Sequence, residues 1–79
     1  MGVSELRTIL LDTSLSLFER YRAMFALRDK ADDESVIAIV DGLEDKSALF
    51  RHEIAFVLGQ LQNPVSEDAL SKVTIIFYY

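Results

Sequence analysis

The chain has 79 residues, of which 51% are hydrophobic and 10% aromatic, with no cysteine and a net charge of −5 at pH 7. This length allows one small domain, which buries only about 60% of its unfolded surface and gains stability from a neighbouring unit. The composition excludes a disordered chain, a disulfide scaffold and a thiolate metal site, and the acidic balance disfavours nucleic acid. No apolar run reaches the roughly 18 residues of a membrane span. We therefore expect a mostly helical, cytoplasmic protein with no direct nucleic-acid or membrane partner.

Apolar residues at helical spacing predict a series of short helices separated by polar turns. Ser4 can cap the first helix, and residues 12–14 form the turn that follows it. The second helix is expected from Leu17 to about Asp29, because it combines a wide apolar stripe with positive charges toward its C-terminal end. That stripe consists of Leu17, Phe18, Tyr21, Met24, Phe25 and Leu27.

Three further helices are predicted in the second half of the chain. An aspartate pair at residues 32–33 can cap the third helix, and Ser47 can cap the fourth. The fourth helix is expected to run to about Gln62, because the residue before Pro64 disfavours helical backbone. The proline can itself open a fifth helix over residues 65–73.

The second and fourth helices repeat one another. Residues 20–27 align with residues 51–58 at an offset of 31, with arginine, phenylalanine and leucine at matching positions. A period above about 30 residues with two helices in each unit is typical of α-solenoids, and about two and a half units are visible. The alternative is an unrelated helical bundle whose helices share these residues by chance.

The solenoid interpretation predicts an all-α fold of stacked helical hairpins between Glu5 and Gln62. Its expected core consists of Phe25, Leu27, Val40, Leu43, Phe50, Ile54, Val57, Leu58 and Leu61.

The fourth helix contains the sequence Arg51-His52-Glu53, which includes the only histidine of the chain. A neutral imidazole beside a carboxylate suits a metal such as iron, although one such pair cannot complete a site that usually has about three protein ligands. On a helical projection, His52 lies nearly opposite the apolar stripe, close to Phe56 and Gly59. From spacing alone, a surface or capping histidine is a more common explanation than a metal ligand.

Two segments resemble the signature of deoxyhypusine hydroxylases, which are HEAT-like repeat enzymes. They are Leu17-Phe-Glu-Arg-Tyr-Arg-Ala-Met-Phe-Ala-Leu-Arg28 and Ser47-Ala-Leu-Phe-Arg-His-Glu-Ile-Ala-Phe-Val-Leu-Gly-Gln-Leu-Gln62. The resemblance covers about Glu5 to Gln62 and matches the start of the C-terminal half of the family. It implies a HEAT-like α-solenoid that belongs to a non-haem di-iron monooxygenase. In that family, four His-Glu motifs hold iron, which activates dioxygen to hydroxylate deoxyhypusine on a translation initiation factor.

By this resemblance His52 and Glu53 occupy the third His-Glu motif and bind iron, while the preceding repeat carries Tyr21-Arg22 in place of a ligand pair. We expect residues 1–79 to form a single HEAT-like segment, with a family-like part at 5–62 and a divergent tail at 63–79. The strand-like run at residues 74–79 departs from the family pattern and indicates a truncated, mis-spliced or fragmentary product. With one motif of four, the chain alone is expected to be inactive and to bind Fe²⁺ weakly.

A second class of function stays open for the same segment. Helical-repeat modules commonly bind partners along one face, and an acidic module would suit a basic partner. The chain is therefore either part of an iron-dependent monooxygenase or a catalytically silent module that binds another protein.

Overall fold

The computed structural model describes residues 1–71 as helices joined by short turns, with no strand among them. The strand-like run expected at residues 74–79 lies outside the described residues. The elements are α1 (Val3–Leu11), α2 (Leu17–Lys30), α3 (Asp33–Val40), the 3-10 helix η1 (Asp41–Glu44), α4 (Ala48–Leu61) and the 3-10 helix η2 (Pro64–Ser66). The all-α prediction is confirmed.

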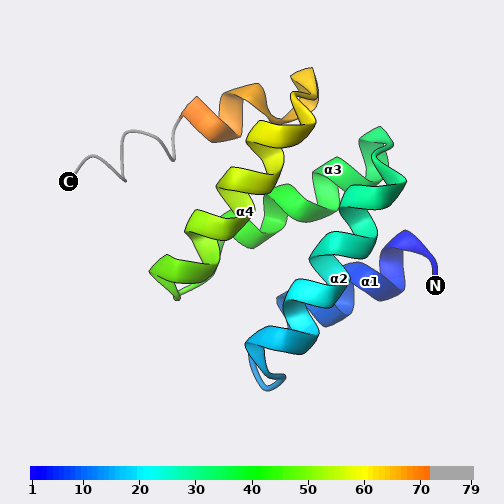
Figure 1. The fold of residues 1–79 in the computed structure, drawn as a ribbon, viewed down its shortest axis with the longest axis vertical. Coiled ribbons are helices and arrows are strands. Elements are labelled where there is room, and N and C mark those ends of the chain that lie inside the picture. Colours follow the sequence, from blue (N-terminus) through cyan, green and yellow to red (C-terminus); the bar gives the residue numbers. More distant parts are fainter. Residues whose placement is uncertain (72–79) are drawn as a thin grey trace.

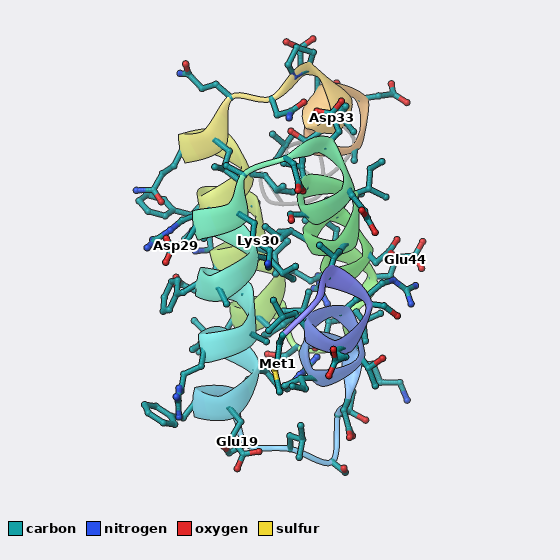
Figure 2. The ribbon with its side chains drawn as sticks, turned by 90° about the vertical axis from the view of Figure 1, so that its right-hand side faces the viewer. Met1, Glu19, Asp29, Lys30, Asp33 and Glu44 are labelled. Carbon is teal, nitrogen blue, oxygen red and sulfur yellow. The ribbon has the colours of Figure 1, made fainter. Side chains whose placement is uncertain are left out.

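The helices form two antiparallel hairpins that stack in two layers (Figure 1). In the first hairpin α1 packs on α2, and in the second α3 and η1 pack on α4. One layer contains α2 and α4 side by side, and the other layer contains α1 and α3. Figure 2 shows the two layers edge-on. This is the stacking expected of an α-solenoid.

The period of the repeat is confirmed by the helix boundaries. Helices α2 and α4 each have 14 residues; they begin at Leu17 and Ala48 and end at Lys30 and Leu61. The two helix starts are 31 residues apart, and so are the two helix ends. This is the offset at which residues 20–27 align with residues 51–58. The serine before each helix, Ser16 or Ser47, accepts a hydrogen bond from a backbone N–H of the first turn, as an N-cap does.

The C-terminal ends of the two helices also match. Ala31 and Gln62 cap α2 and α4 in the left-handed conformation, with φ angles of 56° and 51°. Both caps donate their N–H to a carbonyl four residues earlier. Because a side chain is strained in this conformation and glycine is the usual residue there, the two hairpins share a small conformational cost at the same position.

Helix starts differ in part from the prediction. Gly2, not Ser4, is the N-cap of α1, so that Ser4 lies inside the first turn. Asp32 caps α3 by accepting a hydrogen bond from the backbone N–H of Ser35. The predicted fifth helix begins instead as η2, since Asn63 caps it ahead of Pro64, and residues 67–71 are helical.

The core lies between the two layers and contains most of the predicted residues. Leu27, Leu43 and the predicted face of α4 are buried, whereas Val40 and Leu61 are half-buried. The fully buried residues of that face are Phe50, Ile54, Val57 and Leu58.

The burial of Phe25 was predicted wrongly, because its side chain is 41% exposed. It occupies the same repeat position as Phe56, and both rings are exposed on the outward side of their helices. The Arg28 guanidinium lies 4.9 Å from the centroid of the Phe25 ring, so the ring is partly covered by a cation instead of by the core.

A close contact between η1 and α4 explains why residue 42 is a glycine, a position that the sequence analysis did not consider. A Cβ atom at Gly42 would lie 2.9 Å from the Cδ1 atom of Ile54 and 3.4 Å from the ring of Phe50. A larger residue would therefore require the Ile54 side chain, or the two elements themselves, to shift. Gly42 therefore allows the fourth helix to approach the layer behind it.

Candidate metal centre

Helix α4 directs its two sides to different environments. Phe50 and Ile54 point into the core, while His52 is exposed and Glu53 is half-buried between the two directions. This matches the helical projection, in which His52 lies nearly opposite the apolar stripe. The predicted ligand pair is therefore accessible from outside the hairpin stack.

The residues around His52 make an outward face that is partly apolar. On this face we group the exposed apolar side chains of α2 and α4 that lie within about one turn of His52 or of its counterpart, Tyr21. The outward face contains Leu17, Phe18, Phe25, Leu49 and Phe56, which are 39% to 69% exposed. Gly59 is also exposed, and a Cβ atom there would meet no atom within 4 Å, so the described residues give no steric reason for this glycine.

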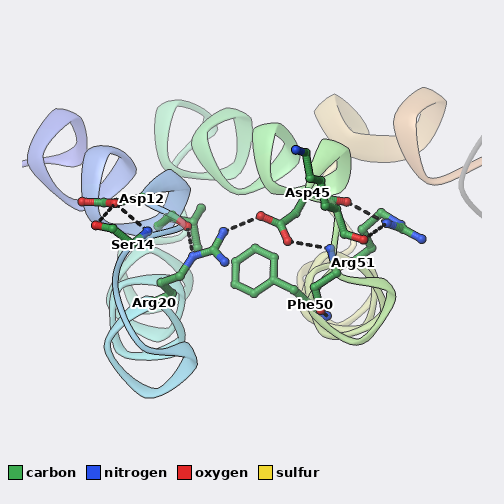
Figure 3. A network of polar contacts seen from close by, with 9 residues as sticks. Asp12, Ser14, Arg20, Asp45, Phe50 and Arg51 are labelled. Carbon is green, nitrogen blue, oxygen red and sulfur yellow. Dashed lines mark hydrogen bonds and ion pairs between the residues drawn. The ribbon is translucent and has the colours of Figure 1, made fainter.

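A buried polar network fixes α4 against the first hairpin (Figure 3). Arg20 is only 4% exposed; its Nε donates to the carbonyl oxygen of Leu10 at 2.8 Å, and its Nη2 donates to Oδ1 of Asp45 at 2.6 Å. The Arg20 guanidinium carbon also lies 4.0 Å from the centroid of the Phe50 ring. One side chain thus ties together both hairpins and the start of the helix that carries His52.

Asp45 is held in its charged form by this network. Burial alone would raise the pKa of its carboxyl, but the hydrogen bonds from Arg20 and the Ser47 backbone N–H, with the charges of Arg20 and Arg51, lower the pKa below its usual value. Arg51 donates from Nη1 to the carbonyl oxygens of Asp45 and Lys46 at 2.7 and 3.0 Å. The loop before α4 is therefore pinned by two arginines.

Tyr21 connects the first hairpin to the region of Glu53. Its ring stacks on the Phe50 ring, with centroids 5.7 Å apart and an interplanar angle of 4°. Burial raises the pKa of the Tyr21 hydroxyl, the negative charge of Glu53 raises it further, and the positive charge of Arg20 opposes the rise. The hydroxyl consequently stays protonated at neutral pH and can donate a hydrogen bond.

Sequence analysis proposed His52 and Glu53 as ligands but did not identify the residues that pack around them. Tyr21 was placed in the apolar stripe of its helix and at a position without a ligand, and Arg20 was noted only through its alignment with Arg51. The alignment of Arg20 with Arg51 was a usable signal, because two arginines at one repeat position point to a structural role.

The donor chemistry of the pair fits iron, but the number of ligands does not complete a site. An imidazole and a carboxylate are common ligands of non-haem iron. Among residues 1–71, no group of three or more His, Cys, Asp and Glu side chains is placed to hold a metal ion. Further ligands would have to come from outside the described part of the chain.

A separate groove of about 750 Å³ lies between α1 and α2, at the edge of the first hairpin. It is lined by apolar residues that include Leu6 and Ala23, and by charged residues that include Glu19 and Lys30. His52 and Glu53 do not line it. Within residues 1–71, none of the helices has the length and apolar character needed to traverse a lipid bilayer.

Comparison with known proteins identifies relatives of this segment, although no model of a known protein family matches the chain. The chain is 66% identical over 65 residues to a deoxyhypusine hydroxylase of Drosophila melanogaster and 62% identical over 65 residues to that of Danio rerio, with 82% of the chain covered in each case. The corresponding protein of Dictyostelium discoideum is 59% identical over 68 residues. The chain spans about a fifth of the length of these relatives, namely 21% or 22%.

The fold of the chain also agrees with that of a solved structure, whose protein has the same name as these relatives. Human deoxyhypusine hydroxylase in complex with glycerol matches 90% of this chain and 25% of its own chain, with a TM-score of 0.87 and 52% sequence identity. The likeness in sequence covers 82% of the chain and the likeness in fold covers 90%, so the two overlap over most of its length. The chain is thus homologous to one segment of the deoxyhypusine hydroxylases, and it has their helical-repeat fold.

Proposed function

We propose that this chain acts as part of a deoxyhypusine hydroxylase, an iron-dependent monooxygenase of hypusine biosynthesis. The substrate would be a deoxyhypusine side chain on a translation initiation factor. The observation that carries this proposal is the extended identity to enzymes of that name, 66% in the fruit-fly protein, over the stretch that contains Arg51-His52-Glu53. The activity belongs to a complete enzyme, of which this chain spans about a fifth.

In this proposal His52 and Glu53 are ligands of the iron. The exposed position of His52 and the half-buried position of Glu53 leave both side chains accessible to a metal that is shared with another part of the enzyme. Iron, when bound, would supply the redox chemistry that activates dioxygen. The residues of this chain would hold the metal, and the Arg20–Asp45 network would fix the helix that presents them.

The rest of the ligand set would come from outside residues 1–71, because two ligands leave the metal under-coordinated. We expect the isolated chain to bind Fe²⁺ with a dissociation constant no better than roughly tens of micromolar, and not to hydroxylate deoxyhypusine. We further propose that residues 1–79 form a single repeat segment, with residues 63–79 as a divergent tail.

The proposal is tested in a chimera in which residues 5–62 replace the matching segment of the fruit-fly relative. His52→Ala and Glu53→Ala should each remove most of the bound iron and abolish product, because each change deletes a metal ligand. Gln60→Ala, an exposed change on the same helix, is the matched control and should retain both. Iron is measured by elemental mass spectrometry and hydroxylation by mass spectrometry of the substrate protein.

A second candidate function is a catalytically silent module that binds another protein. The exposed apolar side chains of the outward face favour it, because several large apolar residues on one face are a feature of protein-binding surfaces. Full iron loading and full turnover in both ligand variants would contradict the metal assignment and favour this module instead.

A further inference from the structure

The hydroxyl of Tyr21 is a buried polar group without a hydrogen-bond partner among the described residues. Buried hydroxyls almost always have a partner, and leaving one unpaired costs free energy. Tyr21 is also the repeat counterpart of His52, since each is the second residue of its aligned segment, 20–27 or 51–58. A buried hydroxyl at this position is therefore available to donate to a polar group of the neighbouring helix.

The ring of Tyr21 has a fixed position relative to α4. It stacks almost parallel to the ring of Phe50, with 5.7 Å between the centroids, and Phe50 is itself fully buried beneath the Arg20 guanidinium. A ring held in this way can turn about its own axis, but it cannot move its hydroxyl far from α4. The hydroxyl position is therefore set by the core.

Glu53 is the acceptor that this arrangement brings close. It follows Phe50 by three residues and so lies on the adjoining turn of the same side of α4. Its negative charge adds to the effect of burial in raising the pKa of the Tyr21 hydroxyl. A carboxylate accepts hydrogen bonds and never donates when ionised, whereas a tyrosine hydroxyl can donate, so the two groups are chemically complementary.

We propose that Tyr21 is a positioning residue for the candidate metal centre, whose hydroxyl donates a hydrogen bond to the Glu53 carboxylate and holds it in the orientation that binds iron. This inference rests on the proposed function, because it assumes that Glu53 is a ligand. Carboxylates that bind metals are themselves hydrogen-bonded by neighbouring groups, and loss of such a group weakens metal binding. The first hairpin thus contributes to a site whose ligands lie on the second.

The experiment compares Tyr21→Phe with the parent chimera described above. Phenylalanine keeps the ring that stacks on Phe50 and removes only the hydroxyl. Ser35→Ala is the matched control, because the Ser35 hydroxyl, in the first turn of α3, is the other buried hydroxyl without a partner among the described residues. The Fe²⁺ dissociation constant is measured by competition with a chelator, and the visible absorption of the Co²⁺-substituted protein reports the ligand geometry.

We expect Tyr21→Phe to weaken Fe²⁺ binding by ~10- to 100-fold and to change the Co²⁺ spectrum. Its melting temperature should be unchanged or higher, because an unpaired hydroxyl has been removed from the interior. Ser35→Ala should leave both metal readouts unchanged. A merely structural role of Tyr21 would lower the melting temperature of Tyr21→Phe and leave the Co²⁺ spectrum unchanged.

Two results would overturn the inference, and they are distinguishable from failure of the proposed function. Fe²⁺ affinity and a Co²⁺ spectrum that are unchanged in Tyr21→Phe would refute the positioning role, even where His52→Ala and Glu53→Ala lose their iron. An equal loss of affinity in Ser35→Ala would refute it as well. If the two ligand variants keep their iron, the proposed function fails and the positioning role fails with it.

Discussion

The first hairpin, α1 with α2, and the second hairpin, α3 with α4, share a scaffold but differ in what they present to the outside. Both long helices begin after a capping serine, have the same length and end on a left-handed residue. At the equivalent repeat positions, however, α2 has Tyr21-Arg22 where α4 has His52-Glu53. The two hairpins thus share one backbone structure, while the side chains at equivalent positions differ in their chemistry.

Even identical residues acquire different roles from their place in the stack. Arg20 and Arg51 occupy the same repeat position. Arg20 is buried between the hairpins and pairs with the Asp45 carboxylate, whereas Arg51 is half-buried and donates to backbone carbonyls. The difference arises because Arg20 has a following hairpin against it within the described residues. Burial, and not residue type, decides how much each arginine contributes.

Arg20→Ala should therefore be far more damaging than Arg51→Ala. Removing Arg20 leaves Asp45 buried without its partner, which typically costs about 3–5 kcal/mol, while loss of the Arg51 hydrogen bonds should cost roughly 1–2 kcal/mol. Urea unfolding followed by the helical circular dichroism signal measures both. Equal losses of stability in the two variants would show that the hairpins are not joined through Arg20.

Substitutions on the buried face of α4 should likewise cost more stability than substitutions on its exposed face. Phe50→Ala removes a fully buried ring that contacts both Tyr21 and Arg20, and such changes cost about 3–5 kcal/mol. Phe56→Ala changes a ring that is 59% exposed, for which we expect less than about 1 kcal/mol. The same unfolding experiment checks the pair, and a large effect at Phe56 would mean that the outward face is covered.

The Arg20–Asp45 pair should also give the chain a specific dependence on acid. Because the folded-state pKa of Asp45 lies below the unfolded value near 3.8, its stabilising contribution is complete above that pH and is lost as the pH falls through the folded-state pKa. The difference in unfolding free energy between the parent chain and Asp45→Asn should therefore be constant well above pH 3.8 and shrink below it. A difference that does not change with pH would contradict the charged pair.

The smallest expected effect concerns the two helix ends. Ala31→Gly and Gln62→Gly should each stabilise the chain by roughly 0.5–1 kcal/mol, because glycine adopts the left-handed conformation without the strain of a side chain. Thermal unfolding should show a similar rise in melting temperature for both. Stabilisation at only one position would indicate that the hairpins end differently in solution.

Much of this architecture was predictable from the sequence, because it depends on local signals. Ser47 before an apolar stripe and Pro64 after it bracket α4 closely, and the offset of 31 between residues 20–27 and 51–58 predicted the stacking. Phe25 was misplaced because an aromatic ring was assumed to be buried. Its repeat partner, Phe56, had already been projected close to His52, away from the apolar stripe.

The supporting contacts of the candidate site were not predictable from local patterns. The pairing of Arg20 with Asp45 joins residues that are 25 positions apart, and the place of Gly42 beneath Ile54 depends on how closely two elements approach. Such contacts follow from packing between hairpins, which helical periodicity does not describe. The ligand pair itself could be proposed from sequence only through resemblance to a family.

The most direct test of the central contrast compares Arg22→Ala with Glu53→Ala, since these residues stand at equivalent positions of the two hairpins. Iron content is measured per chain in the chimera that carries residues 5–62. Arg22→Ala should retain the iron of the parent, because Arg22 belongs to the scaffold copy without ligands, and Glu53→Ala should lose most of it. Equal iron in the two variants would contradict the assignment of the metal pair to the second hairpin.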